Sequence, residues 1–323
     1  MYQDTVQSDK LLQNPKVIAI FFVVVFGGLF AVNLFPIILG ELLRPALSVN
    51  SNGGYYDRFV LAFTSTVLVV GALFVVGLLK FKYQVMATWA VLLLLFLAFF
   101  YGFHLDIGFI EQKVWFMISQ GVVTTLYISA ISISIAFVIA LVGAVSKLSS
   151  NAFAYSIATF YTSFFRGLPL LMQVYLIYIG LPQLGYVINA VPAGILALSL
   201  CYGAYMTEVF RAGISSVPKG QWEGARAMGF NFSLTMRKVI LPQAIPLVIP
   251  PTGNYFIAML KDSSLVSVIG VWELMFLART LGQAEFKHME MLITAAIMYW
   301  VLSMVFEFFQ SRLERKFGKS TKR

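Results

Sequence analysis

The chain has 323 residues, of which 59% are hydrophobic and only 11% are charged, and its formal net charge at pH 7 is +9. It carries far more apolar surface than a soluble domain of this length buries, so the composition argues against a soluble enzyme and indicates a membrane protein. The single cysteine excludes an intrachain disulfide framework and a cysteine-based zinc site.

Eight apolar runs are long enough to cross a bilayer, for which about 18 residues are needed. We expect the first run to be retained, because it is too long for a signal-peptide core and no small-residue cleavage site follows it. The first three runs consist mainly of Phe, Val and Leu and predict lipid-facing helices. The predicted spans are 17–39, 59–79, 85–103, 114–145, 152–181, 191–214, 243–260 and 290–310.

Two of these runs contain helix breakers. Proline removes a backbone donor and kinks a helix, which is tolerated at membrane depth only where protein or a water-filled cavity satisfies the freed groups. Both runs should therefore face the interior of a helix bundle. The breakers are Gly167 and Pro169, next to Arg166, in the fifth run, and Pro246, Pro250, Pro251 and Gly253 in the seventh.

The longest polar stretch inside the chain, 211–242, separates the sixth and seventh runs, and we take it as cytoplasmic. If each run crosses once, 16 of the 23 Lys and Arg residues lie inside and six lie outside, with Arg166 within a span. This asymmetry follows the positive-inside rule and predicts that both termini are cytoplasmic. It also accounts for much of the basic charge without nucleic acid. Residues 261–289 then lie outside and are apolar enough to predict a short re-entrant or interfacial helix.

The cytoplasmic stretch reads QWEGARAMGFNFSLTMRKVILPQAIP from Gln221. It resembles the signature loop of ATP-binding-cassette (ABC) importer permeases, with Gly224 where the family has Ala and Val239 where Ile is usual. In that family the loop forms a short helix that docks on the ATPase subunit, whereas the competing interpretation is an ordinary amphipathic loop. The resemblance assigns ATPase coupling to Gln221, Glu223, Gly224, Ala225, Met228, Gly229, Leu241 and Pro242.

The residue types in this loop suit a docking helix. The small residues Gly224, Ala225, Ala227 and Gly229 allow close approach to a partner, and Gly229 can end the helix in the left-handed conformation. We expect Glu223 near the helix start, where the helix dipole favours an acid.

Further motifs look like permeases for polar amino acids: SFFRGLPLLMQVYLIYIGLP from Ser163, YGAYMTEVFRAGISSVPKGQWEGA from Tyr202, LPQAIPLVIPPTGNYFIAMLKDSSLVSVIG from Leu241 and GVVTTLYIS from Gly121. The resemblance implies an all-α integral membrane protein with about eight transmembrane helices. A five-helix type I ABC importer core at 111–312, with its coupling loop at 215–242, follows three extra helices at 1–110 and precedes a basic cytoplasmic tail at 313–323.

Ionisable and polar residues inside membrane spans are candidates for the substrate path because they are costly there. A zwitterionic amino acid needs a cation for its carboxylate and an acceptor for its ammonium group. The candidates are Arg166, Tyr205, Glu208, Asn254 and Lys261.

A structural interpretation competes for each of them. Glu208 can pair with Arg211 at i,i+3, and Arg166 can cap the carbonyls of a broken helix. Lys261 and Asp262 match a family motif at the outer end of the seventh run, and we expect this pair to hold an outer gate.

The tail sequence GKS at 318–320 is no phosphate-binding loop, since Leu313 stands where the first Gly is needed. We therefore expect no catalytic site and no cofactor on this chain, with ATP and Mg²⁺ on a partner. His104 and His288 are far apart in the sequence and predict no metal site.

The resemblance places the chain in a bacterial inner membrane. The implied partners are a dimer of ABC ATPase subunits, a second permease subunit (homologous or identical), an extracytoplasmic binding protein, an amino acid and the lipid bilayer. The alternative function is an ion-coupled secondary transporter or channel, which also uses broken helices.

Overall fold

The computed structural model describes residues 15–32, 34, 38–47, 54–101, 103 and 105–318, and these residues contain helices and no strand. The chain divides into two compact units, residues 1–105 and 106–323, where the sequence placed the boundary at 110/111. Within the described ranges, six helices are long and apolar enough to cross a membrane, or seven if one bent pair is a single span. His104 and the tail residues 319–323 lie outside the described part.

The described residues of the N-terminal unit form four helices: α1 (Pro15–Val32), α2 (Ile38–Leu47), α3 (Tyr55–Leu78) and α4 (Phe81–Tyr101). Aromatic rings hold α1 against α3, and the Phe26 and Phe59 centroids lie 5.4 Å apart in an edge-to-face arrangement. Arg58 on α3 donates a hydrogen bond to the Phe30 carbonyl at 2.9 Å. The first predicted span, 17–39, is too long, because α1 ends at Val32 and a separate helix follows it.

The second unit begins with a continuous helical run of 41 residues, Ile107–Lys147. It comprises α5 (Ile107–Phe116), a π-helical turn η2 (Met117–Val122) and α6 (Val123–Lys147). At 1.5 Å per residue this run is about 60 Å long, roughly twice the thickness of the hydrocarbon layer. Part of it must therefore tilt or extend beyond the bilayer.

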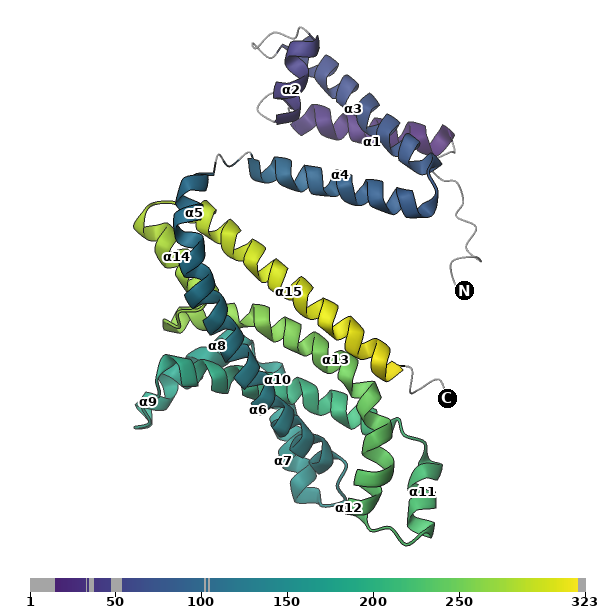
Figure 1. The fold of residues 1–323 in the computed structure, drawn as a ribbon, viewed down its shortest axis with the longest axis vertical. Coiled ribbons are helices and arrows are strands. Elements are labelled where there is room, and N and C mark those ends of the chain that lie inside the picture. Colours follow the sequence, from purple (N-terminus) through teal and green to yellow (C-terminus); the bar gives the residue numbers. More distant parts are fainter. Residues whose placement is uncertain are drawn as a thin grey trace. The chain divides into compact units, whose positions relative to one another are not determined.

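The remaining elements of the second unit form a bundle in which α13 and α15 run side by side (Figure 1). They are α7 (Ala152–Gly167), α8 (Leu170–Tyr175), η3 (Leu176–Gly180), α9 (Leu181–Gln183), α10 (Ala190–Ser215), α11 (Lys219–Ala227), α12 (Phe232–Thr235), η4 (Met236–Ile240), α13 (Leu241–Asp262), η5 (Ser263–Ile269), α14 (Leu274–Ala284) and α15 (His288–Gly318).

The centre of this bundle is α10, which packs most extensively on α6. Small residues let the two backbones approach: a Cβ added to Gly143 on α6 would lie 2.6 Å from the Thr207 hydroxyl oxygen on α10. Across the same interface the Ser199 hydroxyl donates to the Ser132 carbonyl at 3.3 Å. Because α10 is buried along most of its length, its polar residues must find partners inside the bundle.

The segment between α13 and α15 is helical, as predicted, and contains two short helices. The apolar stretch forms the 3-10 helix η5, which ends at Gly270 with φ +83°, and the α-helix α14 starts only after Glu273. Glu273 is fully buried and caps α14 by accepting hydrogen bonds from two backbone N–H groups at its start. The Tyr299 hydroxyl on α15 donates to the same carboxylate at 2.5 Å.

An ion pair joins the start of α5 to the turn before α15. Asp106 caps α5 by accepting from the Phe109 N–H at 3.0 Å, and its other carboxylate oxygen lies 2.6 Å from the Lys287 Nζ. The hydrogen bond from Lys287 lowers the pKa of Asp106, and the same bond raises the pKa of Lys287.

Candidate functional site

The break predicted in the fifth apolar run is a bend of 107° between α7 and the helix that follows it. Leu168 precedes a proline and adopts an extended conformation with ψ 138°, as steric clash with the proline ring requires. Pro169 also is extended, and α8 begins after it.

A glutamine satisfies the carbonyl groups at this bend. The Gln173 Nε2 donates to the carbonyl oxygens of Phe165 at 2.8 Å and Leu168 at 2.9 Å. The prediction that Arg166 caps these carbonyls is therefore wrong. Its guanidinium instead lies 5.6 Å from the centroid of the Tyr205 ring and 3.5 Å from a Glu208 oxygen.

The bend borders a cavity of about 440 Å³, which we call the bend pocket. Its wall brings together the bend itself, the middle of α10 and the C-terminal half of α13. The lining residues are Arg166, Gly167, Leu168, Pro169, Leu170, Cys201, Tyr202, Tyr205, Tyr255, Ala258 and Asp262.

The bend pocket presents a cation, an anion and aromatic rings. Arg166 supplies the positive charge, with 43% of its side chain exposed. Asp262 supplies the negative charge, and one of its oxygens accepts a hydrogen bond from the Tyr202 hydroxyl at 2.7 Å. The rings of Tyr205 and Tyr255 lie 6.0 Å apart between α10 and α13. Separate charges of opposite sign beside aromatic faces suit a zwitterionic ligand.

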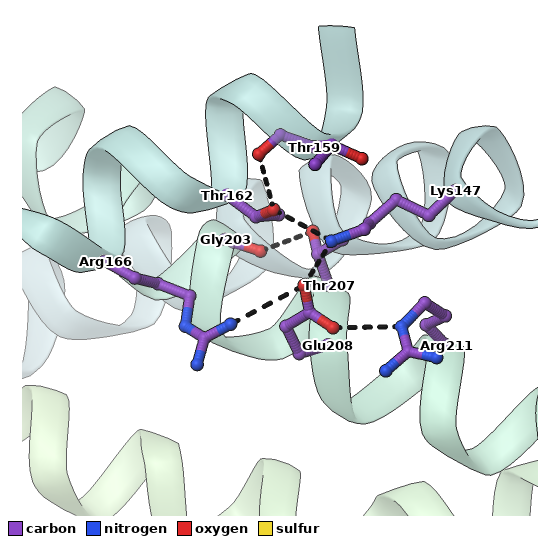
Figure 2. Close-up of polar contacts among 8 residues, drawn as sticks. All are labelled: Lys147, Thr159, Thr162, Arg166, Gly203, Thr207, Glu208 and Arg211. Carbon is purple, nitrogen blue, oxygen red and sulfur yellow. Dashed lines mark hydrogen bonds and ion pairs between the residues drawn. The ribbon is translucent and has the colours of Figure 1, made fainter. Parts of the chain in front are cut away.

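Next to the pocket, Glu208 is the centre of a cluster of charges (Figure 2). One of its carboxylate oxygens contacts Lys147 and Arg166, and the other lies 2.9 Å from the Arg211 Nε. Lys147 also donates to the Thr162 hydroxyl at 3.0 Å. Three cations around one carboxylate leave an excess of positive charge, and each of the Glu208 oxygens already has a protein partner. The structural interpretation of Glu208 is thus favoured over direct substrate contact.

Two of the predicted substrate-path residues lie away from the bend pocket. Asn254 turns toward α15, where its side-chain oxygen accepts from Gln310 at 2.8 Å. Lys261 is exposed in the last turn of α13, and its neighbour Asp262 forms a hydrogen bond with Tyr202. The structure thus brings Arg166 and Tyr205 into one pocket, places Glu208 beside it, and leaves Asn254 and Lys261 outside.

Several residues of this site were not predicted from the sequence. Lys147 is one of the 16 Lys and Arg residues that the positive-inside count places in the cytoplasm, but its side chain is just 11% exposed. No sequence pattern indicated a site role for Tyr202 or Tyr255, apart from their proximity to Tyr205 and Asn254 in the sequence. The role of Gln173 could not be predicted either, because it depends on the angle of the bend and not on sequence spacing.

The signature loop contains the nine-residue helix α11, which lies beside the start of α13 (Figure 1). One face of α11 is anchored to its own chain, with Ala225 only 4% exposed and Trp222 packed against the core. The Trp222 ring also stacks on Phe232, with the centroids 6.5 Å apart. Gln221 accepts a hydrogen bond from Gln243 on α13 at 3.2 Å. These contacts connect α11 to α12 through Trp222 and to the start of α13 through Gln221.

The end of α11 follows the prediction, because Gly229 has φ +78°. The Phe230 N–H bonds the Ala225 carbonyl and the Gly229 N–H bonds the Arg226 carbonyl, the hydrogen-bond pattern of a Schellman motif. Two expectations were wrong. Glu223 is the fifth residue of the helix and lies beyond its first turn, and Ala225 faces the protein rather than a partner.

On another face of α11, the described part of the chain leaves open space beside Gly224. A Cβ added to Gly224 would meet nothing within 4 Å, and Met228 at the helix end is 72% exposed. Glu223 and Ala227 are exposed on the same side. We call Glu223, Gly224, Ala227 and Met228 the coupling face.

Several known proteins are similar to this chain. A probable amino-acid ABC transporter permease protein, YckA of Bacillus subtilis, is 39% identical over 62% of this chain and 88% of its own length. The arginine transport system permease protein ArtQ of the same organism is 39% identical over 62% of this chain and 91% of its own. A crystal structure of an amino acid ABC transporter with histidines superimposes with a TM-score of 0.62 at 37% identity, covering 66% of this chain and 99% of that one.

The helices described above, together with these similarities, confirm the type I importer fold that was expected from the sequence. Residues 132–319 match the binding-protein-dependent transport system inner membrane components, and α1 to α4 lie outside this match. The match spans more than half of the chain and includes the bend pocket and α11. The chain therefore belongs to the family of binding-protein-dependent transport system inner membrane components.

Proposed function

We propose that this chain forms the membrane pathway of an ATP-driven importer for polar amino acids. The bend pocket is the observation that carries this proposal, because it presents Arg166 and Asp262 as opposite charges beside Tyr205 and Tyr255. An amino acid carries a carboxylate and an ammonium group, which these two charges match. The names of the similar permeases support the same class of substrate.

The roles in the pocket follow from the chemistry of each side chain. The planar guanidinium of Arg166 is suited to a carboxylate, and Asp262 is suited to an ammonium group. Tyr205 and Tyr255 provide apolar faces with polar edges, along which a polar side chain can pass. Glu208 acts indirectly, by holding Arg166.

Coupling to ATP hydrolysis is assigned to α11. The coupling face has no large side chain at Gly224, so a groove on an ATPase subunit can approach its backbone closely. The anchored face, with Trp222 and Ala225, would transmit a displacement of the ATPase subunit to α13 through Gln221 and Gln243. ATP and Mg²⁺ belong to the ATPase dimer in this scheme.

The assembly proposed has further parts. A second permease subunit completes the pathway, and a binding protein delivers the amino acid at the outer face. The scheme has α11 in the cytoplasm. Both termini are then cytoplasmic if each of the eight predicted runs crosses once, and the count of Lys and Arg supports this orientation.

A substitution at the coupling face tests the proposal. Gly224→Trp adds bulk where the structure has open space, so the permease should fold normally but fail to dock. Gly224→Ala is the matched control, because it adds only a methyl group at the same position. In proteoliposomes with the ATPase subunits and binding protein, we expect Gly224→Trp to lower amino acid uptake and substrate-stimulated ATP hydrolysis at least tenfold, and Gly224→Ala to retain both.

Two results would contradict this function. One is full coupling in the Gly224→Trp variant, which would remove α11 from the ATPase interface. The other is uptake by the isolated chain under an ion gradient with no ATP, which would favour a secondary transporter.

A further inference from the structure

The bend between α7 and α8 leaves two carbonyl groups that the helices themselves do not satisfy. In a regular helix the Phe165 carbonyl would accept from the N–H four residues later, but that residue is Pro169, which has none. The Leu168 carbonyl belongs to an extended residue between the two helices. In the interior of a membrane bundle, unsatisfied carbonyls of this kind are costly.

The side chain of Gln173 serves both carbonyls with one amide nitrogen, at 2.8 and 2.9 Å. It is only 2% exposed, so water does not compete for these bonds. The orientation of the amide is determined, because only the nitrogen can face two carbonyl oxygens. The amide oxygen is buried and has no hydrogen-bond partner in the described part of the chain, so the donor end is the one that the fold uses.

The two carbonyls lie on either side of Arg166 in the sequence. Phe165 lies in the last turn of α7 just before Arg166, and Leu168 follows Gly167, the last residue of that helix. A side chain from α8 that bonds both carbonyls therefore fixes the backbone from which the Arg166 side chain extends. The Arg166 guanidinium then reaches Tyr205 and Glu208 together.

We propose that Gln173 is a positioning residue for the bend pocket: its amide clips the two sides of the break and thereby aims Arg166 between Tyr205 and Glu208. The proposal rests on the function assigned above to the bend pocket. Gln173 itself is absent from the pocket lining and acts through the backbone. Without the clip, α7 and α8 can change their angle, and Arg166 loses its fixed direction.

The first test measures the bend directly. Spin labels at Phe160→Cys on α7 and Ile179→Cys on η3, both at exposed positions, report the distance across the break. We expect one narrow distance distribution in the parent protein and a broadened or shifted one in Gln173→Met, which keeps the approximate size but has no donor. Gln183→Met, at an exposed position on α9, is the control and should leave the distribution unchanged.

If Gln173→Met does not fold, Gln173→Leu offers a second apolar variant. Its side chain has no donor for the two carbonyls, so the same broadening is expected. An unchanged distance distribution in a folded Gln173 variant would overturn the clip.

The second test asks whether the effect passes through Arg166. In the reconstituted importer, we expect Gln173→Met to lower uptake about tenfold with Arg166 present and less than twofold in an Arg166→Gln background, because the two changes remove the same contact. An equal loss in both backgrounds would show a general structural role and overturn the proposal.

The two tests separate this inference from the proposed function. Full uptake by Arg166→Gln alone would refute the substrate role of Arg166. The distance measurement would still decide whether Gln173 holds the bend.

Discussion

Replacing Glu208 by Gln removes the negative charge that pairs with Lys147, Arg166 and Arg211. The Lys147 and Glu208 side chains are 11% and 21% exposed, so their pair is largely withdrawn from water. Removing one partner of a buried pair costs about 3–5 kcal/mol, whereas partners as exposed as Arg166 and Arg211 contribute about 0–1 kcal/mol each. Because the Gln amide oxygen can still accept a hydrogen bond, we expect a loss of about 3 kcal/mol, at the lower end of that range.

Thermal unfolding of the purified protein measures this loss. One kcal/mol shifts the Tm of a domain of this size by about 2–4 °C, so Glu208→Gln should lower the Tm by about 6–12 °C. The control is the double variant Lys147→Met/Glu208→Gln, which removes both charges of the buried pair. It should be more stable than Glu208→Gln alone, because Lys147 is the cation least able to reach water.

Either of two results would refute this reasoning. A Tm within about 2 °C of the parent, on the scale just used, would show that Glu208 holds no buried charge in place. A double variant less stable than Glu208→Gln would show that Lys147 does not depend on Glu208.

Three further predictions concern other parts of the second unit. Gly229→Ala should lower stability by about 1–2 kcal/mol, measured as a Tm shift, because a residue with a Cβ is strained at φ +78°. Gln310→Leu should loosen α13 from α15, since Gln310 donates to the Pro250 carbonyl at 3.1 Å, and a Tm equal to that of the parent would contradict this. The Asp106–Lys287 pair should contribute equally from pH 5 to pH 9. Its contribution to stability falls only when the pH drops through the lowered pKa of Asp106, below the ordinary 3.8, or rises through the raised pKa of Lys287, above 10.5. The difference in Tm between the parent and Asp106→Asn, followed across pH, checks this, and a steady decline between pH 9 and pH 5 would contradict it.

The helices of the second unit could be predicted closely, because membrane spans depend on long apolar runs. Residues 191–214 were expected as a span, and α10 covers Ala190–Ser215. The break at Pro169 and the left-handed Gly229 were also predictable, since both follow from the backbone chemistry of a single residue.

The partners within the site could not be predicted, because they depend on how helices pack. Lys147 and Glu208 are 61 residues apart, and Tyr202 and Asp262 are 60 apart. No local pattern relates such pairs. The ion pair expected between Lys261 and Asp262 relied on adjacency in the sequence, but the structure pairs Asp262 with Tyr202.

The position of Gln173 illustrates the same limit. It follows Phe165 by eight residues, a spacing that would place the two residues more than two turns apart along a straight helix. Only the 107° bend turns that separation into a hydrogen bond. The role of a side chain near a helix break thus depends on the angle of the break, and no local sequence pattern specifies that angle.

Arg166 belongs at once to the wall of the bend pocket and to the charge cluster around Glu208. The guanidinium lies 3.5 Å from the Glu208 carboxylate, so an anion in the pocket that draws it away from α10 weakens that contact. For such an anion, loading the pocket and loosening the cluster are two sides of one equilibrium, and each shifts the other by the same free energy.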